Sequence, residues 1–266
     1  SSPRNDRLAY LTRADATCYL DELDGPGWSA EEIGFTGGEP FMNPEIIGLL
    51  RDSLARGYRV LVLTNAMRPM MRHQDSLLAL KEDYGAKLTF RVSIDHYTEA
   101  LHEAERGADS WGRMMAGFLW LARLGFSLNV AGRARWQESD AEMRSGYAAL
   151  FARHGISLDA GDLQDLVLFP EMDASRDVAE ITTACWGILG VDEASMMCAT
   201  SRMVVRRKGA DSPSVVACTL LPYAPEFELG ETLEAATAER VSLNHPHCAR
   251  FCVLGGGACS ATAGEV

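Results

Sequence analysis

The chain has 266 residues, of which 47% are hydrophobic, so it can bury a large core in one domain or in one domain with a small appendage. Its formal net charge of −12 argues against a basic surface for a DNA or RNA backbone. No stretch reaches the roughly eighteen consecutive apolar residues of a membrane-spanning helix, and no charged-then-apolar leader opens the sequence. We therefore expect a cytoplasmic protein with neither nucleic acid nor membrane as a partner.

Helical and strand patterns alternate along the first two thirds of the chain. Thr12, Asn43 and Ser110 are predicted helix caps, and the short β-branched runs between helices are typical of buried parallel strands. Predicted helices cover 12–23, 43–57, 70–82, 110–124 and 140–154, and predicted strands cover 32–35, 59–65, 87–94, 127–131 and 163–169. Repeated βα units predict an α/β protein with a parallel sheet, open or closed into a barrel. Because the chain opens on a helix, we expect one strand of a βα unit to be missing upstream.

A glycine-rich loop follows the first predicted strand. Gly37 and Gly38 let the backbone approach a ligand closely, at the strand edge where parallel α/β folds bind their ligands. Glu39 suits an ammonium group better than a phosphate, and the Lys and Ser/Thr of a phosphate-binding loop are missing. An ordinary βα turn is the alternative interpretation of this loop.

The sequence from Phe35 to Pro40, Phe-Thr-Gly-Gly-Glu-Pro, resembles the GGEP motif of radical S-adenosylmethionine (radical SAM) enzymes, whose loop binds the SAM amino group. The strand ends at 62–65 and 92–95 resemble the third and fourth strands of that family, and 102–111 resembles the segment that follows. The resemblance covers roughly residues 1–170 and implies a partial (β/α)6 TIM-like barrel, here with its first unit missing. The residues that it implies for SAM binding are Thr36, Gly37, Gly38, Glu39, Thr64, Asn65, Ser93, Asp95, Asn129 and Arg133, the last toward the SAM carboxylate.

One family motif is absent. The Cys-x3-Cys-x2-Cys that holds the catalytic [4Fe–4S] cluster in radical SAM enzymes does not occur in the 266 residues. The family pattern would place it immediately before Ser1, so we expect a chain truncated at that point. A chain that has lost the cluster and its chemistry is the alternative. In either case we expect these residues alone not to cleave SAM.

Five of the seven cysteines cluster between residues 198 and 259, which indicates metal ligation rather than disulfides in a large cytosolic protein. Two β-rich runs at 202–207 and 213–217 predict a hairpin, and a short helix is predicted at 231–240. The hairpin would bring Cys198 and Cys218 together at its open end. Four thiolates can hold a [4Fe–4S] cluster or a zinc ion. His245 and His247 in the same region are consistent with zinc as the alternative. The candidate ligands are Cys198, Cys218, Cys248, Cys252 and Cys259.

This cysteine-rich tail resembles the twitch or SPASM extension of radical SAM enzymes, a hairpin and helix around an auxiliary Fe–S cluster. The resemblance implies a barrel domain at 1–180 and an auxiliary-cluster domain at 181–266. It also implies that SAM and a reduced [4Fe–4S] cluster generate a 5′-deoxyadenosyl radical, which abstracts hydrogen from a peptide, a protein side chain or a small molecule. Ferredoxin or flavodoxin would be the one-electron reductant.

Two other function classes remain open from the residues. The first is a non-catalytic metal-binding or peptide-recognition protein on a degenerate barrel, which the missing cysteine motif would favour. The second is a zinc-dependent hydrolase, for which no His-Glu-x-x-His helix occurs in the sequence. The sequence therefore predicts a radical SAM oxidoreductase or modifying enzyme, with these two as alternatives.

Overall fold

The computed structural model describes residues 7–171 and 177–254. They divide into two compact units, each described here by itself. The barrel unit comprises residues 12–168, and the cysteine unit comprises residues 7–11, 169–171 and 177–254. No helix in the described ranges is both long enough and apolar enough to cross a membrane.

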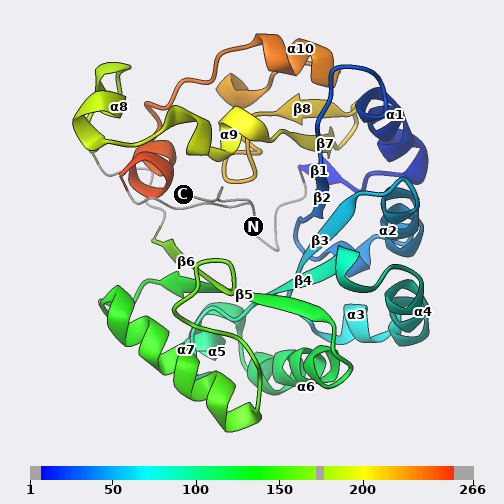
Figure 1. Ribbon diagram of the computed structural model, residues 1–266, viewed down its shortest axis with the longest axis vertical. Helices are drawn as coiled ribbons and strands as arrows, with labels where there is room; N and C mark the ends of the chain where they lie inside the picture. The colour runs from blue at the N-terminus through cyan, green and yellow to red at the C-terminus, as the bar shows by residue number, and fades with distance from the viewer. Residues whose placement is uncertain (1–6, 172–176, 255–266) are drawn as a thin grey trace. The chain divides into compact units, whose positions relative to one another are not determined.

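The barrel unit is built on a curled half-barrel of parallel strands (Figure 1). In spatial order the strands are β2 (Glu32–Phe35), β3 (Arg59–Thr64), β4 (Leu88–Ser93), β5 (Ser127–Ala134) and β6 (Leu166–Pro170). Sequence order and spatial order coincide, as expected when each strand is joined to the next by a helical crossover. The predicted α/β half-barrel is thereby confirmed.

Helices follow the strands in the barrel unit. They are α1 (Arg13–Leu23), α2 (Ile46–Ala55), α3 (Arg68–Met71), α4 (Gln74–Tyr84), α5 (Glu99–Arg106), α6 (Ser110–Arg123) and α7 (Asp140–His154), with the short turns η1 (Pro40–Met42) and η2 (Gly85–Lys87). Helix α1 begins with a capping box, in which the Thr12 hydroxyl accepts from the Asp15 N–H at 3.1 Å and the Asp15 carboxylate accepts from the Thr12 N–H at 3.0 Å. The predicted cap at Thr12 is confirmed.

Three local predictions were wrong. Asn43 does not cap α2; its side chain accepts from the Glu45 N–H at 2.9 Å, and the helix begins only at Ile46. The helix predicted at 70–82 is two helices, which are interrupted at His73, whose backbone angles are not helical. Ser110 is not a cap either, because Asp109 in a left-handed conformation precedes α6 and the Ser110 side chain is buried. Helix α5 was not predicted.

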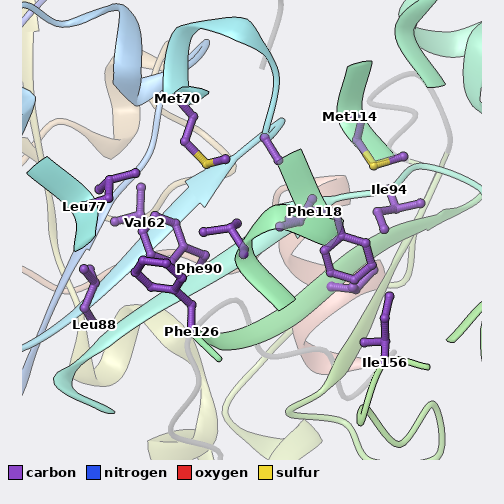
Figure 2. Packing of buried hydrophobic residues seen from close by; sticks show 14 of the residues in the cluster. Val62, Met70, Leu77, Leu88, Phe90, Ile94, Met114, Phe118, Phe126 and Ile156 are labelled. Carbon is purple, nitrogen blue, oxygen red and sulfur yellow. The ribbon is translucent and has the colours of Figure 1, made fainter. Parts of the chain in front are cut away.

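The main core lies between the sheet and the helices (Figure 2). Alternate residues of each strand point into it, because successive side chains leave opposite faces of a strand. In β4 these are Leu88, Phe90 and Val92, all completely buried. Phe90 packs edge-on against Phe126, with ring centroids 5.3 Å apart. The intervening residues of β4, which include Arg91 and Ser93, therefore face the concave side of the half-barrel.

The cysteine unit contains a small antiparallel sheet in the order β1 (Leu8–Ala9), β7 (Met203–Arg207) and β8 (Ser214–Val216). The β7–β8 pair confirms the predicted hairpin, whereas the pairing of Leu8 with Arg207 was not predicted. Short helical segments complete the unit: α8 (Ala184–Leu189), η3 (Glu193–Ser195), α9 (Met197–Thr200), η4 (Pro225–Phe227), α10 (Leu233–Ala238) and the π-helical η5 (Cys248–Val253).

Candidate functional site

The loop after β2 exposes its backbone at two glycines. Gly37 has a φ of 148°, which favours glycine, and both Gly37 and Gly38 are exposed. A Cβ atom added at either position would have no heavy atom within 4 Å. The peptide groups of this loop are therefore open to a ligand at the carboxyl edge of the sheet.

Glu39 anchors this loop to the end of β3. Its Oε1 accepts from the Thr64 hydroxyl at 2.8 Å and from the Phe41 N–H at 3.2 Å, and its Oε2 accepts from the Asn65 N–H at 2.8 Å. Burial raises the pKa of Glu39, although these hydrogen bonds act to lower it. A carboxylate has about four acceptor positions, so Glu39 keeps one for a further donor such as an ammonium group.

A second carboxylate lies beyond the end of the adjacent strand β4. Asp95 is 2% exposed and forms a two-point ion pair with Arg106 of α5, through Nε to Oδ2 and through Nη2 to Oδ1 at 3.0 Å. Burial alone would lower the pKa of Arg106, but the hydrogen bonds and charge of Asp95 raise it. The positive charge of Arg106 also acts to lower the pKa of Glu39. Arg106 thus couples the ends of β2 and β4 electrostatically.

The polar residues predicted on β5 have protein partners. Asn129 is buried opposite Arg91 in the β4–β5 register, and its Oδ1 accepts from the Arg91 Nε at 2.9 Å. Arg133 pairs with Glu105 of α5, which also binds Arg135. Of the ten predicted SAM-binding residues, the structure joins Glu39 directly to Thr64 and Asn65 and places Thr36, Gly37 and Gly38 in the same loop. Ser93 and Asp95 lie at the end of the neighbouring strand β4, whereas Asn129 is the third residue of β5 and Arg133 lies near the end of that strand.

The sequence analysis missed a buried histidine beside this edge. His96 is 1% exposed; its Nε2 lies 2.7 Å from Glu138 Oε2 and its Nδ1 lies 2.9 Å from the Thr98 hydroxyl. Glu138 also accepts from the Tyr97 hydroxyl. Burial acts to raise the pKa of Glu138, but the hydrogen bonds from Tyr97 and His96 lower it. These contacts fasten the segment after β4 to the segment after β5, and no local sequence signal links the two.

His102 of α5 is completely buried and supports a pH prediction. Neither ring nitrogen has a hydrogen-bond partner within the part of the chain that the structure describes, and the ring packs edge-on against Trp111 at 5.5 Å. Burial lowers the pKa of His102 from its ordinary value of 6.5. As the pH falls below 6.5, His102 therefore takes up a proton in the unfolded chain before it does so in the folded chain. The free energy of unfolding decreases until the pH passes the lower pKa of the folded state.

We expect His102→Leu to remove this acid sensitivity. At pH 7 the variant should be more stable than the wild type by about 1 kcal/mol, because an unsatisfied buried polar group is removed. In urea unfolding the advantage should grow between pH 7 and pH 5.5. His102→Gln, which keeps a buried polar group but cannot titrate, is the control and should lose stability without the pH dependence. An unchanged pH dependence in His102→Leu would contradict the assignment.

Four cysteines line one small cavity in the cysteine unit. They are Cys198, Cys218, Cys248 and Cys252, and the cavity of about 20 Å³ is otherwise apolar. None of the cysteines within the described ranges forms a disulfide. Burial, followed by repulsion between neighbouring thiolates, raises the pKa of Cys248 to about 12, and burial with the same repulsion raises that of Cys252 to about 12. Cys259 lies outside the described residues.

The cavity can be compared with what each kind of metal group requires. In the described ranges, no three His, Cys, Asp or Glu side chains converge as a single metal ion requires. Zinc needs four ligands at about 2.0–2.3 Å from one point, whereas a [4Fe–4S] cluster takes one thiolate at each of four separated iron atoms. Neither His245 nor His247 lines the cavity. The donors that line the cavity are four thiols, a set that either kind of metal group can use.

Residues 6–133 match the model of the radical SAM superfamily. This part of the chain is similar to a radical SAM domain. The matched segment contains the glycine loop with Glu39, the ends of β3 and β4, and β5 as far as Arg133. Members of this superfamily are enzymes, and the radical SAM fold implies SAM and a [4Fe–4S] cluster.

Comparison with solved structures supports the same fold. The chain is similar to anSMEcpe with bound AdoMet, at a TM-score of 0.59 and 13% identity over 94% of this chain and 77% of that one. It is also similar to Streptococcus suis SuiB bound to S-adenosylmethionine, at a TM-score of 0.49 and 15% identity, and it spans 39% of the SuiB chain while 66% of this chain is covered. No curated protein sequence matches the chain. At 13% identity the likeness to anSMEcpe shows the fold alone, a partial TIM-like barrel.

Proposed function

We propose that this chain binds SAM and an auxiliary [4Fe–4S] cluster as part of a radical SAM oxidoreductase or modifying enzyme. The observation that carries the proposal is Glu39, fixed by three hydrogen bonds beneath the open backbone of Gly37 and Gly38, within the segment that matches the superfamily. A ligand with an ammonium group finds an acceptor, a negative charge and accessible peptide groups there. With a reduced cluster, SAM supplies a 5′-deoxyadenosyl radical for hydrogen abstraction.

The residues around Glu39 receive two kinds of role in this proposal. Thr36, Gly37, Gly38 and Glu39 hold the SAM amine, and Asn65 and Ser93 line the pocket beside it. Thr64 orients the Glu39 carboxylate through its hydroxyl. Asp95, Asn129 and Arg133 act through the partners they already have, Arg106, Arg91 and Glu105, which keep the strand ends in place.

The catalytic cluster has no ligands in this chain, because the 266 residues contain no Cys-x3-Cys-x2-Cys. We therefore assign no residue to that cluster and derive no step through it. SAM binding is a separate property that the chain can show by itself. The test of the proposal accordingly measures binding rather than turnover.

We expect Glu39→Gln to weaken SAM binding at least tenfold, which corresponds to about 1.4 kcal/mol. Glutamine keeps one oxygen for Thr64 and Phe41, but its amide NH2 would face the Asn65 N–H and the SAM ammonium, both donors. Isothermal titration calorimetry of SAM with the 266-residue chain measures the effect. Glu31→Gln, at the exposed amino end of β2, is the matched control and should bind as the wild type does. Failure of the wild-type chain to bind SAM at millimolar concentration would contradict the proposal.

The auxiliary cluster belongs to the same proposal, in a domain at residues 181–266. Cys198, Cys218, Cys248 and Cys252 supply four thiolates, and the cations of bound iron would reverse the preference of buried thiols for the protonated form. The cavity of about 20 Å³ is smaller than a cluster, so the cysteine side chains must change rotamer to accept one. The substrate we propose, a peptide or protein side chain, rests on the resemblance of this region to SPASM extensions.

Anaerobic reconstitution is expected to give about four iron and four sulfide per chain. Cys218→Ser and Cys252→Ser should each lower that content, since each removes a thiolate from the cavity. Cys18→Ser is the control, because Cys18 lies exposed on α1 in the barrel unit. The preparation should be analysed for iron, sulfide and zinc together. A result of one zinc per chain and no sulfide would contradict the cluster and indicate a structural zinc site.

A further inference from the structure

The turn that follows β3 contains a residue in a strained backbone conformation. Ala66 has a φ of 55°, in the left-handed region that residues with a Cβ atom rarely adopt, and it is completely buried. Such a conformation costs about 1–3 kcal/mol and persists only where the surrounding structure holds it. Contacts around Ala66 in the barrel unit must therefore outweigh the strain.

Hydrogen bonds within the turn provide part of this support. The Ala66 N–H donates to the Thr64 hydroxyl at 3.0 Å, and the Met67 N–H donates to the Asn65 side-chain oxygen at 2.9 Å. Thr64 and Asn65 also bind Glu39, Thr64 through its hydroxyl and Asn65 through its N–H, each at 2.8 Å. The conformation of the turn thus fixes two of the donors that hold the Glu39 carboxylate.

Helix α6 packs against this turn at Gly117. A Cβ atom on Gly117 would overlap the Ala66 carbonyl oxygen and would lie 2.9 Å from the carbonyl carbon. Only a residue without a Cβ atom allows the helix to approach the peptide between Ala66 and Met67 so closely. On the same helix, Met114 and Phe118 are completely buried, which keeps α6 in place. The core therefore holds the helix and the turn against each other.

We propose that Gly117 is a positioning residue for the SAM ammonium site and acts through the turn at 64–67. The close approach of α6 holds the peptide after Ala66 in place, and the turn in that conformation aims the Asn65 N–H at Glu39. The inference rests on the proposed function, because it takes Glu39 as the acceptor of the SAM amine. It adds a residue on α6 that controls the geometry of this acceptor.

Gly117→Ala is expected to weaken SAM binding about tenfold in calorimetry with the 266-residue chain. Burial raises the pKa of Glu39, and the hydrogen bond from the Asn65 N–H is the strongest of the effects that lower it. A displaced turn would weaken this hydrogen bond, so the pKa of Glu39 would rise further. Because Glu39 accepts an ammonium group as a carboxylate, the acidic limit of SAM binding should move upward by about half a pH unit. Loss of stability alone would not move that limit.

Two further variants separate positioning from stability. Leu150→Ala removes a buried side chain of α7 and should cost about 2–5 kcal/mol, but the affinity for SAM and its pH dependence should stay near wild type. Ala66→Gly/Gly117→Ala should recover both properties. Glycine at residue 66 tolerates a wider range of backbone angles, so the peptide before Met67 can turn away from the added Cβ atom.

Each outcome of this experiment decides for or against the positioning role. Unchanged affinity and pH dependence in Gly117→Ala would remove it, and so would an equal loss in Leu150→Ala. If Gly117→Ala does not fold, the double variant decides. SAM binding near wild type in the double variant then supports the role, whereas weak binding or failure to fold contradicts it. A wild-type chain that binds no SAM instead defeats the proposed function, so the two failures are distinguished.

Discussion

Replacement of Gly117 by alanine is expected to lower the free energy of unfolding by about 3 kcal/mol, at the upper end of the range for overpacked cores. A Cβ atom at this position in α6 would lie 1.8 Å from the Ala66 carbonyl oxygen and 2.9 Å from its carbon. The contact is with backbone, so no side chain can turn away to relieve it. Helix α6 cannot retreat cheaply either, because Met114 and Phe118 on it are completely buried in the core.

The same helix offers a matched control for Gly117→Ala. Gly112 also lies in α6, but a Cβ there would meet no heavy atom within 4 Å. Gly112→Ala should therefore stabilise the protein by about 0.5–1 kcal/mol, the usual gain for alanine over glycine in a helix. Urea unfolding of both variants measures the contrast. Equal stability of the two variants would show that α6 does not approach the turn after β3 as closely as described.

Loss of the Arg106 side chain should have a comparable cost. Arg106→Ala leaves the Asp95 carboxylate, 2% exposed, without its cation, and an uncompensated buried charge costs about 3–5 kcal/mol. We expect a value near 3 kcal/mol, the lower end of that range, because the Arg106 side chain is itself 31% exposed and water can reach the vacated position. Unfolding in urea at pH 7 measures the loss.

Arg113→Ala is the control for Arg106→Ala. Arg113 pairs with Asp109 at 3.6 Å on the surface of the adjacent helix, with side chains 63% and 82% exposed, so its removal should change stability by no measurable amount. Asp95→Asn in the Arg106→Ala background should restore part of the loss, since the orphaned charge is then gone. Equal effects of the two arginine substitutions would mean that the Asp95–Arg106 pair is solvated like the surface pair.

The parts of the fold that could be predicted depend on local signals. The five strands alternate with helices at short range, and the β-branched run at β3 is readable without knowledge of its neighbours. The glycine loop is equally local, because two glycines and a carboxylate after a strand restrict what the segment can do. The resemblance grouped Glu39 with Thr64 and Asn65 as SAM-binding residues, and the structure joins them by hydrogen bonds.

The unpredicted parts depend on partners that are distant in the sequence. A buried polar side chain needs a partner, but nothing near Asn129 indicates that Arg91 will take its oxygen. Arg133 was predicted to reach the SAM carboxylate, and nothing near it in the sequence indicates the ion pair that it forms with Glu105 of α5. Helix α5 has only three apolar residues among its eight, Ala100, Leu101 and Ala104, so little hydrophobic signal marks it in the sequence.

The pairing of β1 with β7 makes the barrel unit an insertion within the cysteine unit. Residues 7–11 precede the barrel in the chain, whereas β7 and the four cysteines of the cavity follow it. Direct closure of the loop between Leu8 and Arg207 in an unfolded chain would carry a large entropic cost. Prior folding of the barrel shortens that loop. We therefore expect the sheet of the cysteine unit to be completed after the barrel has formed.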